Sequence, residues 1–281
     1  RYAEMNARFH SLILGEAVTG VRTDAEAAHV TLASGTLLKA RLLVAADSRF
    51  STTRRAMGIA ADLHDFGRSM LVCCMTHDEP HHHAALEWFG YGQTLALLPM
   101  NDDPATGEHR SSVVLTLPSR DIDPLLTLEP AAFNTRMAER FDQRLGRMAL
   151  ASTRHAYPLV AVYPRRLVAQ RFACVGDAAV GMHPVTAHGF NFGLLSIDNL
   201  AGTVRAAHAT GGDVAAAAGL ARYEQTQRRA TLPLYLATQL VIQLYTRDSP
   251  PARALRNLAL HVGERFTPFK RMIAASLTGG A

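Results

Sequence analysis

Short apolar runs separated by glycine, proline and polar residues predict both strands and helices along this chain. Two alternating segments, residues 28–32 and 36–40, flank a turn at Gly35 and predict a β-hairpin. The continuous apolar run over residues 41–46 predicts a strand that is buried on both faces. Apolar residues at helical spacing over residues 1–14 predict a helix.

The middle of the chain has a different texture, with short strand candidates that follow one another without helices between them. These candidates lie at residues 69–76, 84–89, 93–99 and 110–117. Such a succession predicts an antiparallel sheet rather than alternating strand and helix units. An amphipathic helix over residues 129–145, with Phe133, Met137 and Phe141 on one face, and a strand over residues 148–157 follow.

The last third of the chain returns to a strand and then becomes largely helical. Residues 171–175 predict a buried strand, and residues 192–208 and 214–230 predict helices. Further helix is expected beyond them, with interruptions at the prolines. Those prolines are Pro233, Pro250, Pro251 and Pro268.

These textures predict an α/β fold in which one domain is interrupted by another. The first domain is expected over residues 1–62 and 157–281, with a helical C-terminal region, and the inserted antiparallel β-sheet domain over residues 63–156. The inserted domain is the candidate for substrate binding.

Composition excludes several classes of function. The chain has 281 residues, 48% of them hydrophobic, and a net charge of +5 that is spread along the sequence without a basic block, so nucleic-acid binding is not expected. Cys73, Cys74 and Cys174 cannot form a disulfide framework, which favours a reducing, cytoplasmic location. No signal peptide opens the chain, and no apolar run approaches the roughly 20 residues of a membrane span.

Residues 171–200 carry the most specific chemistry. An apolar strand ends in Gly176-Asp177, which puts a carboxylate where open α/β sheets bind ligands. A helix then starts near Gly189, and its first backbone N–H groups, those of Phe190 and Asn191, carry partial positive charge. The alternatives are a strand-end carboxylate that caps a turn and an ordinary glycine-bearing helix start.

This segment resembles the flavin-contacting motif of the FAD-dependent aromatic hydroxylases, the class A flavin monooxygenases. The resemblance implies that FAD is the cofactor and that NAD(P)H is a co-substrate. It also implies that the carboxylate contacts the ribityl chain, while the loop proline and the helix start contact the ring. The cofactor contacts it implies are Gly176, Asp177, Pro184, Gly189, Phe190 and Asn191.

A second segment, residues 42–54, resembles another motif of the same family, in which Asp-Gly follows an apolar strand. The resemblance places Asp47 near the cofactor pyrophosphate and the path of NAD(P)H, and makes Arg54 the cap of the motif. Ser48 stands where the family usually has glycine. The alternative for Asp47 is a turn carboxylate without a ligand.

Residues 83–89, 94–99 and 183–191 are similar to the ubiquinone-biosynthesis branch of that family, and most like the demethoxyubiquinol hydroxylases. The expected substrate contacts are His188, Trp88 and Leu97. No Gly-x-Gly-x-x-Gly fingerprint occurs in the chain. The resemblance therefore implies a Rossmann-like FAD/NAD(P)-binding domain that lacks its N-terminal βαβ unit.

The resemblance implies hydroxylation of the aromatic ring of a polyprenyl phenol or quinol in ubiquinone biosynthesis, with O2 and a C4a-hydroperoxyflavin. Such a substrate would favour peripheral association with the inner face of a membrane or with a biosynthetic complex. A hydroxylase of a soluble aromatic compound and a non-catalytic binding module remain the alternatives. We assign no catalytic acid or base. We also assign no metal site, because consecutive residues such as His81–His83 cannot share one face of a strand or helix.

Overall fold

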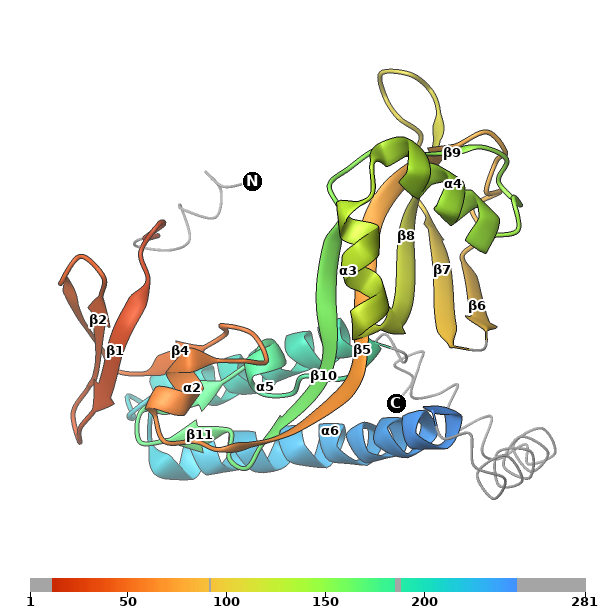
Figure 1. The fold of residues 1–281 in the computed structure, drawn as a ribbon. Coiled ribbons are helices and arrows are strands. Elements are labelled where there is room, and N and C mark those ends of the chain that lie inside the picture. The colour runs from red at the N-terminus through yellow and green to blue at the C-terminus, as the bar shows by residue number, and fades with distance from the viewer. Residues whose placement is uncertain (1–11, 91, 185–187, 247–281) are drawn as a thin grey trace. The chain divides into compact units, whose positions relative to one another are not determined.

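The computed structural model describes residues 12–90, 92–184 and 188–246, and the chain divides into two compact units (Figure 1). Unit 1 comprises Arg1–Asp62 and Val162–Ala281, and unit 2 comprises Leu63–Ala161. Unit 2 is thus inserted into unit 1. The chain enters unit 2 after residue 62 and leaves it after residue 161; the boundaries expected from the sequence lie at residues 62 and 156.

The N-terminal part of unit 1 is an antiparallel sheet of three strands. Its order is β1 (Val18–Thr23), β2 (Ala28–Leu32) and β3 (Leu37–Ala40). Alternate residues of β2 are buried, as expected for a sheet with one packed face. The turn between β2 and β3 contains Gly35 at φ +84, a left-handed conformation that glycine adopts without strain. The predicted hairpin is confirmed.

The second sheet of unit 1 contains β11 (Val168–Ala169), β12 (Phe172–Cys174) and β4 (Leu43–Ala45), in that order. β12 pairs antiparallel with β11 and parallel with β4. The prediction that residues 41–46 form a strand buried on both faces was wrong. β4 is shorter, β12 is its one partner among the described strands, and Val44 is 41% exposed.

Two long helices, α5 (Gly189–Ala209) and α6 (Ala217–Thr246), pack against each other in unit 1 (Figure 1). The short helix α2 (Thr52–Ala56) follows β4, and the single 3₁₀ turn η1 (Gly176–Ala178) follows β12. Most of the helix predicted over residues 1–14 lies outside the described residues, as do the expected breaks at prolines 250, 251 and 268.

The predicted interruption at Pro233 was wrong, because α6 continues through it. Proline removes one hydrogen bond of the helix ladder and crowds the preceding turn. Buried contacts hold the helix on both sides of that point. The Thr231 hydroxyl lies 3.2 Å from the Tyr163 hydroxyl, and the Tyr235 and Tyr163 ring centroids are 4.7 Å apart.

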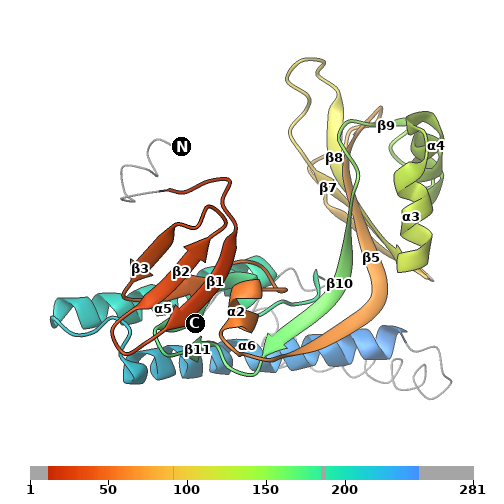
Figure 2. The same cartoon turned by 60° about the vertical axis from the view of Figure 1, so that its left-hand side comes forward.

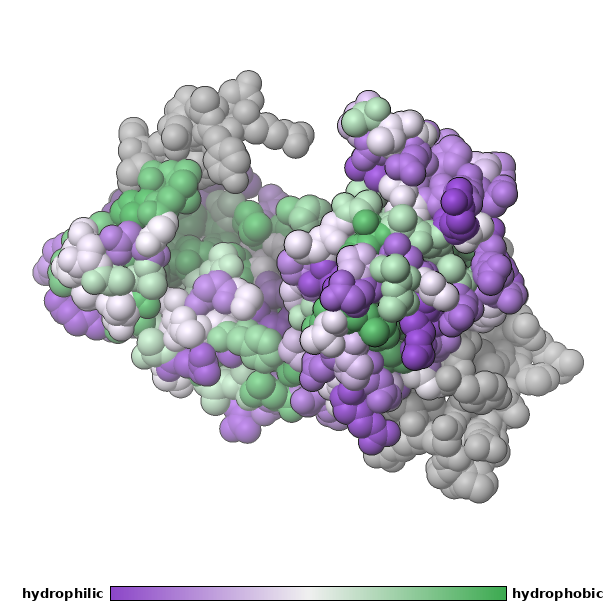
Figure 3. All heavy atoms as spheres, turned by 45° about the horizontal axis from the view of Figure 1, so that its top comes forward, coloured by the Kyte–Doolittle hydropathy of each residue, from purple (hydrophilic) through white to green (hydrophobic). Residues whose placement is uncertain are grey.

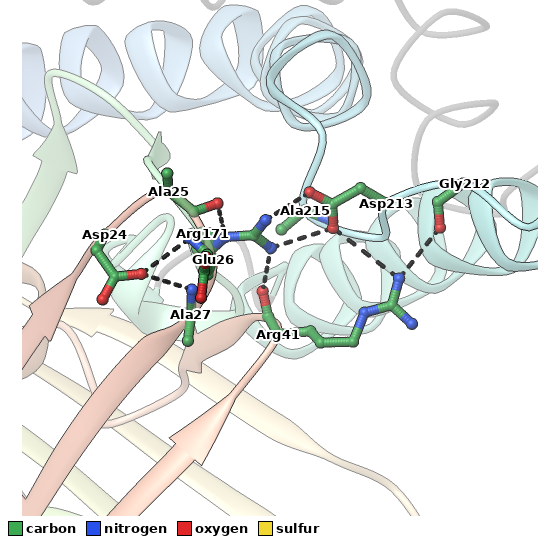
Figure 4. A network of polar contacts seen from close by, with 9 residues as sticks. All are labelled: Asp24, Ala25, Glu26, Ala27, Arg41, Arg171, Gly212, Asp213 and Ala215. Carbon is green, nitrogen blue, oxygen red and sulfur yellow. Dashed lines mark hydrogen bonds and ion pairs between the residues drawn. The ribbon is translucent and has the colours of Figure 1, made fainter.

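Arg171, in the turn between β11 and β12, ties three parts of unit 1 together (Figure 4). Its guanidinium donates to the carbonyl of Ala25 at 2.8 Å and to that of Arg41 at 3.0 Å. It also donates to both oxygens of Asp213, at 3.1 and 2.7 Å. Arg41 in turn donates to the carbonyl of Gly212 at 3.1 Å. The N-terminal sheet and the β11–β12 hairpin are thereby fixed to the α5–α6 connection.

Unit 2 is built on the antiparallel sheet that the sequence predicts, with strand order β10-β5-β8-β7-β6 and β9 paired to β5. The strands are β5 (Ala61–His77), β6 (Leu86–Gly90), β7 (Gln93–Pro99), β8 (His109–Pro118), β9 (Met148–Leu150) and β10 (His155–Pro164). β5 begins earlier than predicted. The strand expected over residues 148–157 is instead divided between β9 and β10.

The helices α3 (Ser119–Thr127) and α4 (Pro130–Arg140) cover one face of the unit 2 sheet (Figure 1 and Figure 2). The amphipathic helix predicted from residue 129 is confirmed, although it ends at Arg140. Phe133, Met137 and Phe141 are buried as expected. They pack with the alternate residues of β5, β7 and β8 in a single apolar core.

Apolar side chains also reach the surface of unit 1. Figure 3 shows apolar surface on the left of the view, where the N-terminal sheet lies. On α5, Phe190, Leu194 and Ile197 are 75%, 50% and 52% exposed, and their spacing places them on one side of the helix. Within the described ranges, no helix combines the length and the apolar character that crossing a membrane requires.

Candidate functional site

Two of the predicted site carboxylates lie at one edge of the second sheet of unit 1. β4 and β12 are parallel neighbours, with Ala45 opposite Cys174. Their carboxyl ends therefore meet at the same edge. Asp47 follows β4 and Asp177 follows β12, so the fold brings together residues that are far apart in the sequence.

The Gly176-Asp177 turn is fastened to the start of α5. Gly176 has φ +61, which is strained for any residue with a Cβ. Its N–H donates to the Ser196 hydroxyl at 2.8 Å, and that hydroxyl donates to the Gly193 carbonyl at 2.6 Å. A Cβ on Gly193 would lie 3.5 Å from the Gly176 Cα. The first turns of α5 therefore pack directly on the turn that carries Asp177.

Arg49 binds the Asp177 carboxylate. The Arg49 Nε and Nη2 atoms both donate to Asp177 Oδ2, at 3.2 and 2.8 Å. The two side chains are 26% and 35% exposed, respectively. No described residue donates a hydrogen bond to Asp177 Oδ1. One oxygen of this carboxylate is thus committed within the protein, while the other has acceptor capacity left.

Asp47 is engaged differently, because both of its oxygens face the start of α2. Oδ1 accepts from the Ser51 hydroxyl at 2.5 Å, and Oδ2 accepts from the Thr53 N–H at 3.0 Å and the Thr52 hydroxyl at 3.4 Å. Burial acts to raise the pKa of Asp47, but the hydrogen bonds from Ser51 and Thr53 outweigh it and lower that pKa below its usual value. Ser48 has φ +74, which explains physically why glycine is usual at this position in the resembled motif.

Arg54 links the two turns by hydrogen bonds. It is 3% exposed, and its Nη1 donates to the carbonyls of Arg49 and Ala178 at 3.1 and 3.3 Å. Burial lowers its pKa. Ser51 caps α2 by accepting the N–H of Arg54 at 2.9 Å. Arg54 therefore links the turn after β4 to η1; its role as a motif cap stays a prediction.

The first backbone N–H groups of α5 have no acceptor within the helix, as at any helix start. Its N-cap residue, His188, makes no side-chain cap hydrogen bond, and the first turn contains no acidic residue. Neither positive φ nor packing requires glycine at position 189, because a Cβ there would contact no atom within 4 Å. A close approach by a ligand is a third reason for glycine.

The structure places the other predicted contacts as follows. Phe190 and Asn191 are exposed in the first turn of α5, and Pro184 is exposed just before residues 185–187, which are not described. His188 is 7% exposed, and its ring centroid lies 6.0 Å from that of Phe192. A substrate contact through His188 would require its buried ring to be uncovered.

The two substrate contacts predicted in unit 2 share the helix-covered side of its sheet. Leu97 is 3% exposed and belongs to the unit 2 core, so a substrate would reach it only after the core rearranged. Trp88 lies opposite Leu95, another core residue, and directly opposed residues project to the same side of a sheet. The Arg144 guanidinium lies over the Trp88 indole, with its central carbon 4.6 Å from the ring centroid.

A surface cleft of about 560 Å³ elsewhere in unit 1 is lined by Arg166, Arg171, Asp213, Leu220 and Glu224, among others, and by none of the predicted site residues. Within the described part of the chain, no three His, Cys, Asp or Glu side chains are placed to hold a metal ion.

The paired strand ends, their carboxylates and the start of α5 form the kind of edge at which open α/β folds bind nucleotide cofactors. A sequence profile described as "FAD binding domain" matches residues 6–233, and the chain belongs to this family. The FAD-binding class predicted from the motifs is thereby confirmed.

Two individual relatives show which branch of the family the chain resembles. The chain is 43% identical over 269 residues to "Ubiquinone hydroxylase UbiM" of Neisseria meningitidis, covering 96% of this chain and 57% of that protein. It is 28% identical over 241 residues to the 3-demethoxyubiquinol 3-hydroxylase of Escherichia coli, covering 85% of this chain and 60% of that protein. The predicted resemblance to the ubiquinone-biosynthesis branch is confirmed. The chain spans less than two thirds of the length of either relative.

Solved structures support the fold. Klebsiella pneumoniae HpxO, in complex with FAD and uric acid, superposes with a TM-score of 0.69 at 19% identity. The match covers 98% of this chain and 69% of that protein. The predicted α/β fold with an inserted antiparallel sheet is therefore confirmed.

Sequence reasoning missed Arg49, Ser196 and Tyr223 at this site. Tyr223 is buried and donates its hydroxyl to the carbonyl of Cys174, the last residue of β12, at 2.6 Å. The signal for Arg49 was available, because opposite charges just after two parallel neighbouring strands meet at one edge. Ser196 and Tyr223 lie within helices, and no local pattern in the sequence distinguishes them.

Proposed function

We propose that this chain is the greater part of an FAD-dependent monooxygenase that hydroxylates the aromatic ring of a polyprenyl phenol or quinol in ubiquinone biosynthesis, with NAD(P)H and O2 as co-substrates. The observation that carries the proposal is the packing of the Gly176-Asp177 turn on the start of α5. A carboxylate and a set of helix N–H donors at one place suit a ligand that carries both hydroxyl donors and electron-rich acceptors.

The residues at this edge fit FAD. Asp177 Oδ1 would accept a hydrogen bond from a ribityl hydroxyl, and the N–H groups of Phe190 and Asn191 would stabilise negative charge on the ring system. Gly189 would let the ring approach the backbone. When bound, FAD supplies the redox chemistry and the transfer of oxygen. The task of the chain's own residues is to orient the ring and exclude water from it.

We also propose that the FAD-binding domain includes a further strand and helix outside residues 1–281. Two surfaces of unit 1 support this. β4 is an edge strand among the described strands, with backbone groups that a parallel neighbour would pair. The apolar side of α5 formed by Phe190, Leu194 and Ile197 would bury its exposed area against a neighbouring helix.

FAD titration of the full-length protein tests the cofactor site. Asp177→Asn removes the charge of the proposed acceptor, and Asp198→Asn is the matched control, because Asp198 lies on α5 with its side chain 80% exposed. A hydrogen bond to a charged group contributes about 1.5–3 kcal/mol. Asp177→Asn is therefore expected to weaken FAD binding about 10- to 100-fold. An unchanged dissociation constant in this variant would remove Asp177 from the site.

Turnover assays test the substrate. NAD(P)H oxidation that a short-chain prenyl phenol or quinol stimulates, with one oxygen atom added to that compound by mass spectrometry, is the expected result. Hydroxylation of a soluble phenol alone would favour the alternative substrate class. A holoenzyme that binds FAD but oxidises NAD(P)H with neither compound would contradict the monooxygenase proposal.

A polyprenyl substrate would be presented by a membrane, and we extend the proposal to peripheral membrane association. Leu232 and Leu236, on α6, are 36% and 56% exposed and lie one helical turn apart. Sedimentation with vesicles of anionic phospholipid is expected to pull down the full-length protein, and Leu236→Gln to reduce the bound fraction. Equal binding by both proteins would exclude this part of α6 as the contact.

A further inference from the structure

Arg49 contacts the Asp177 carboxylate directly. It follows β4, while Asp177 follows the parallel neighbour β12, so 128 residues of sequence separate two side chains in direct contact. Two donors of Arg49, Nε and Nη2, converge on Oδ2, at 3.2 and 2.8 Å. No described side chain or backbone group donates to Oδ1. The carboxylate is thus held by one oxygen and presents the other.

Arg49 is itself held in place along its length. Its Nη1 lies 3.5 Å from the carbonyl of Met182, and its own carbonyl accepts from Arg54 at 3.1 Å. A Cβ on Gly181 would lie 2.7 Å from the Arg49 Cβ, so glycine at position 181 leaves room for the arginine stem. A side chain anchored at its backbone, its stem and its guanidinium has little freedom to lose when a ligand binds.

The planar guanidinium matters for this arrangement. It presents several N–H donors in a fixed fork, so it can hold one carboxylate oxygen with two donors and direct a third towards a carbonyl. A lysine ammonium is a compact point charge with no fixed fork. Neutral replacements would leave Asp177 without its charged partner, and its carboxylate would be free to rotate about its side-chain bonds.

We propose that Arg49 is a positioning residue for FAD, which orients the Asp177 carboxylate so that Oδ1 meets a ribityl hydroxyl. This inference rests on the proposed function, because it takes Asp177 as a flavin contact. Arg49 acts through Asp177 and needs no contact with the cofactor. If Arg49 instead braced the two turns without regard to the ligand, its loss would alter stability and leave the FAD site unchanged once folded.

A double-mutant cycle on FAD affinity in the full-length protein separates these two roles. The variants are Arg49→Gln, Asp177→Asn and the double variant, and the dissociation constant is measured by quenching of flavin fluorescence. We expect Arg49→Gln to weaken binding about tenfold. The double variant is expected to match Asp177→Asn within a factor of about two, because Arg49 has nothing to orient once the carboxylate is gone.

Two further variants complete the experiment. Arg205→Gln breaks the exposed pair that Arg205 makes with Asp198 on α5, at 3.7 Å, and is expected to leave FAD affinity unchanged. Arg49→Lys keeps the charge and is expected to restore part of the FAD affinity lost in Arg49→Gln. If the glutamine variant does not fold, the FAD affinity of Arg49→Lys is measured in its place. The visible absorption spectrum of bound flavin is recorded in each case as a readout that does not depend on turnover.

The outcomes distinguish the inference from the proposed function. Wild-type affinity in Arg49→Gln, together with weakened binding in Asp177→Asn, overturns the role of Arg49 and leaves the FAD site intact. A full additional tenfold loss in the double variant also overturns it, because Arg49 would then act independently. Unchanged affinity in Asp177→Asn, or no FAD binding by the wild-type protein, removes the proposed site and this inference together.

Discussion

Replacing Ser196 with alanine perturbs the contact between the Gly176 turn and α5. The Ser196 side chain is fully buried, accepts the N–H of Gly176 at 2.8 Å and donates to the Gly193 carbonyl at 2.6 Å. Alanine removes both hydrogen bonds and leaves the Gly176 N–H facing a methyl group. An unpaired buried donor costs about 1–3 kcal/mol, so we expect unit 1 to lose about 2 kcal/mol of its free energy of unfolding.

Thermal unfolding and hydrogen exchange measure this loss. For a domain of this size, each kcal/mol moves the unfolding temperature by about 2–4 °C, so the expected decrease is roughly 4–8 °C. Exchange of peptides that span residues 172–180 should accelerate, because the turn after β12 opens more readily. A shift below about 1 °C with unchanged exchange in these peptides would refute the assigned role of the hydroxyl.

Two controls isolate the hydrogen bonds from other effects. Ser196→Cys nearly preserves the volume of the side chain but offers only a weak donor and acceptor, so its loss should lie between that of alanine and wild type. Ser34→Ala removes a hydroxyl from an exposed turn, where its hydrogen bond to Thr36 is 2.9 Å long. Its effect should stay below about 0.5 kcal/mol. Equal losses at positions 34 and 196 would contradict the reasoning.

Three further predictions concern stability and reactivity. Arg171→Met removes the ties to two carbonyls and one carboxylate, and should lower the free energy of unfolding of unit 1 by about 2 kcal/mol in urea titrations. Burial lowers the pKa of His77 below its ordinary value, so the unfolded chain takes up a proton that the folded chain excludes. Unit 2 should therefore be most stable above about pH 7 and lose stability on acidification through about pH 6.5, and His77→Gln should flatten this dependence in urea midpoints. Burial raises the pKa of the Cys73 and Cys174 thiols to about 12, whereas Cys74 is half-buried. A maleimide at pH 8 should therefore react with Cys74 first and with the other two only after unfolding, as detected by mass spectrometry.

The sheet of unit 2 was predictable because its information is local. Alternating burial along β5, in which Leu71, Cys73 and Met75 face the core, is visible in the sequence as a period of two. The turns that separate its strands are rich in glycine, proline and polar residues. Core residues of α4, Phe133 and Met137, were likewise visible at helical spacing.

The errors arose where packing overrides local preference. Pro233 would end an isolated helix, yet the buried contacts of Thr231 and Tyr235 sustain α6 through it. The apolar run that ends before Asp47 suggested a central strand, whereas β4 has one described partner and exposes Val44. An apolar run predicts that its surface is buried, but it does not predict which element packs against it.

The two strand-end carboxylates show how much of a site depends on tertiary contacts. The sequence places Asp47 and Asp177 in equivalent positions, each just after a parallel strand. Their hydrogen bonds differ. Both oxygens of Asp47 accept hydrogen bonds from the start of α2. These donors come from its own motif, and they lower the pKa of Asp47. Asp177 is bound by Arg49 from the neighbouring strand end at one oxygen only. A ligand hydroxyl would compete with three existing donors at Asp47 and with none of the described ones at Asp177 Oδ1, so of the two carboxylates Asp177 is the one that the fold leaves able to accept a new hydrogen bond.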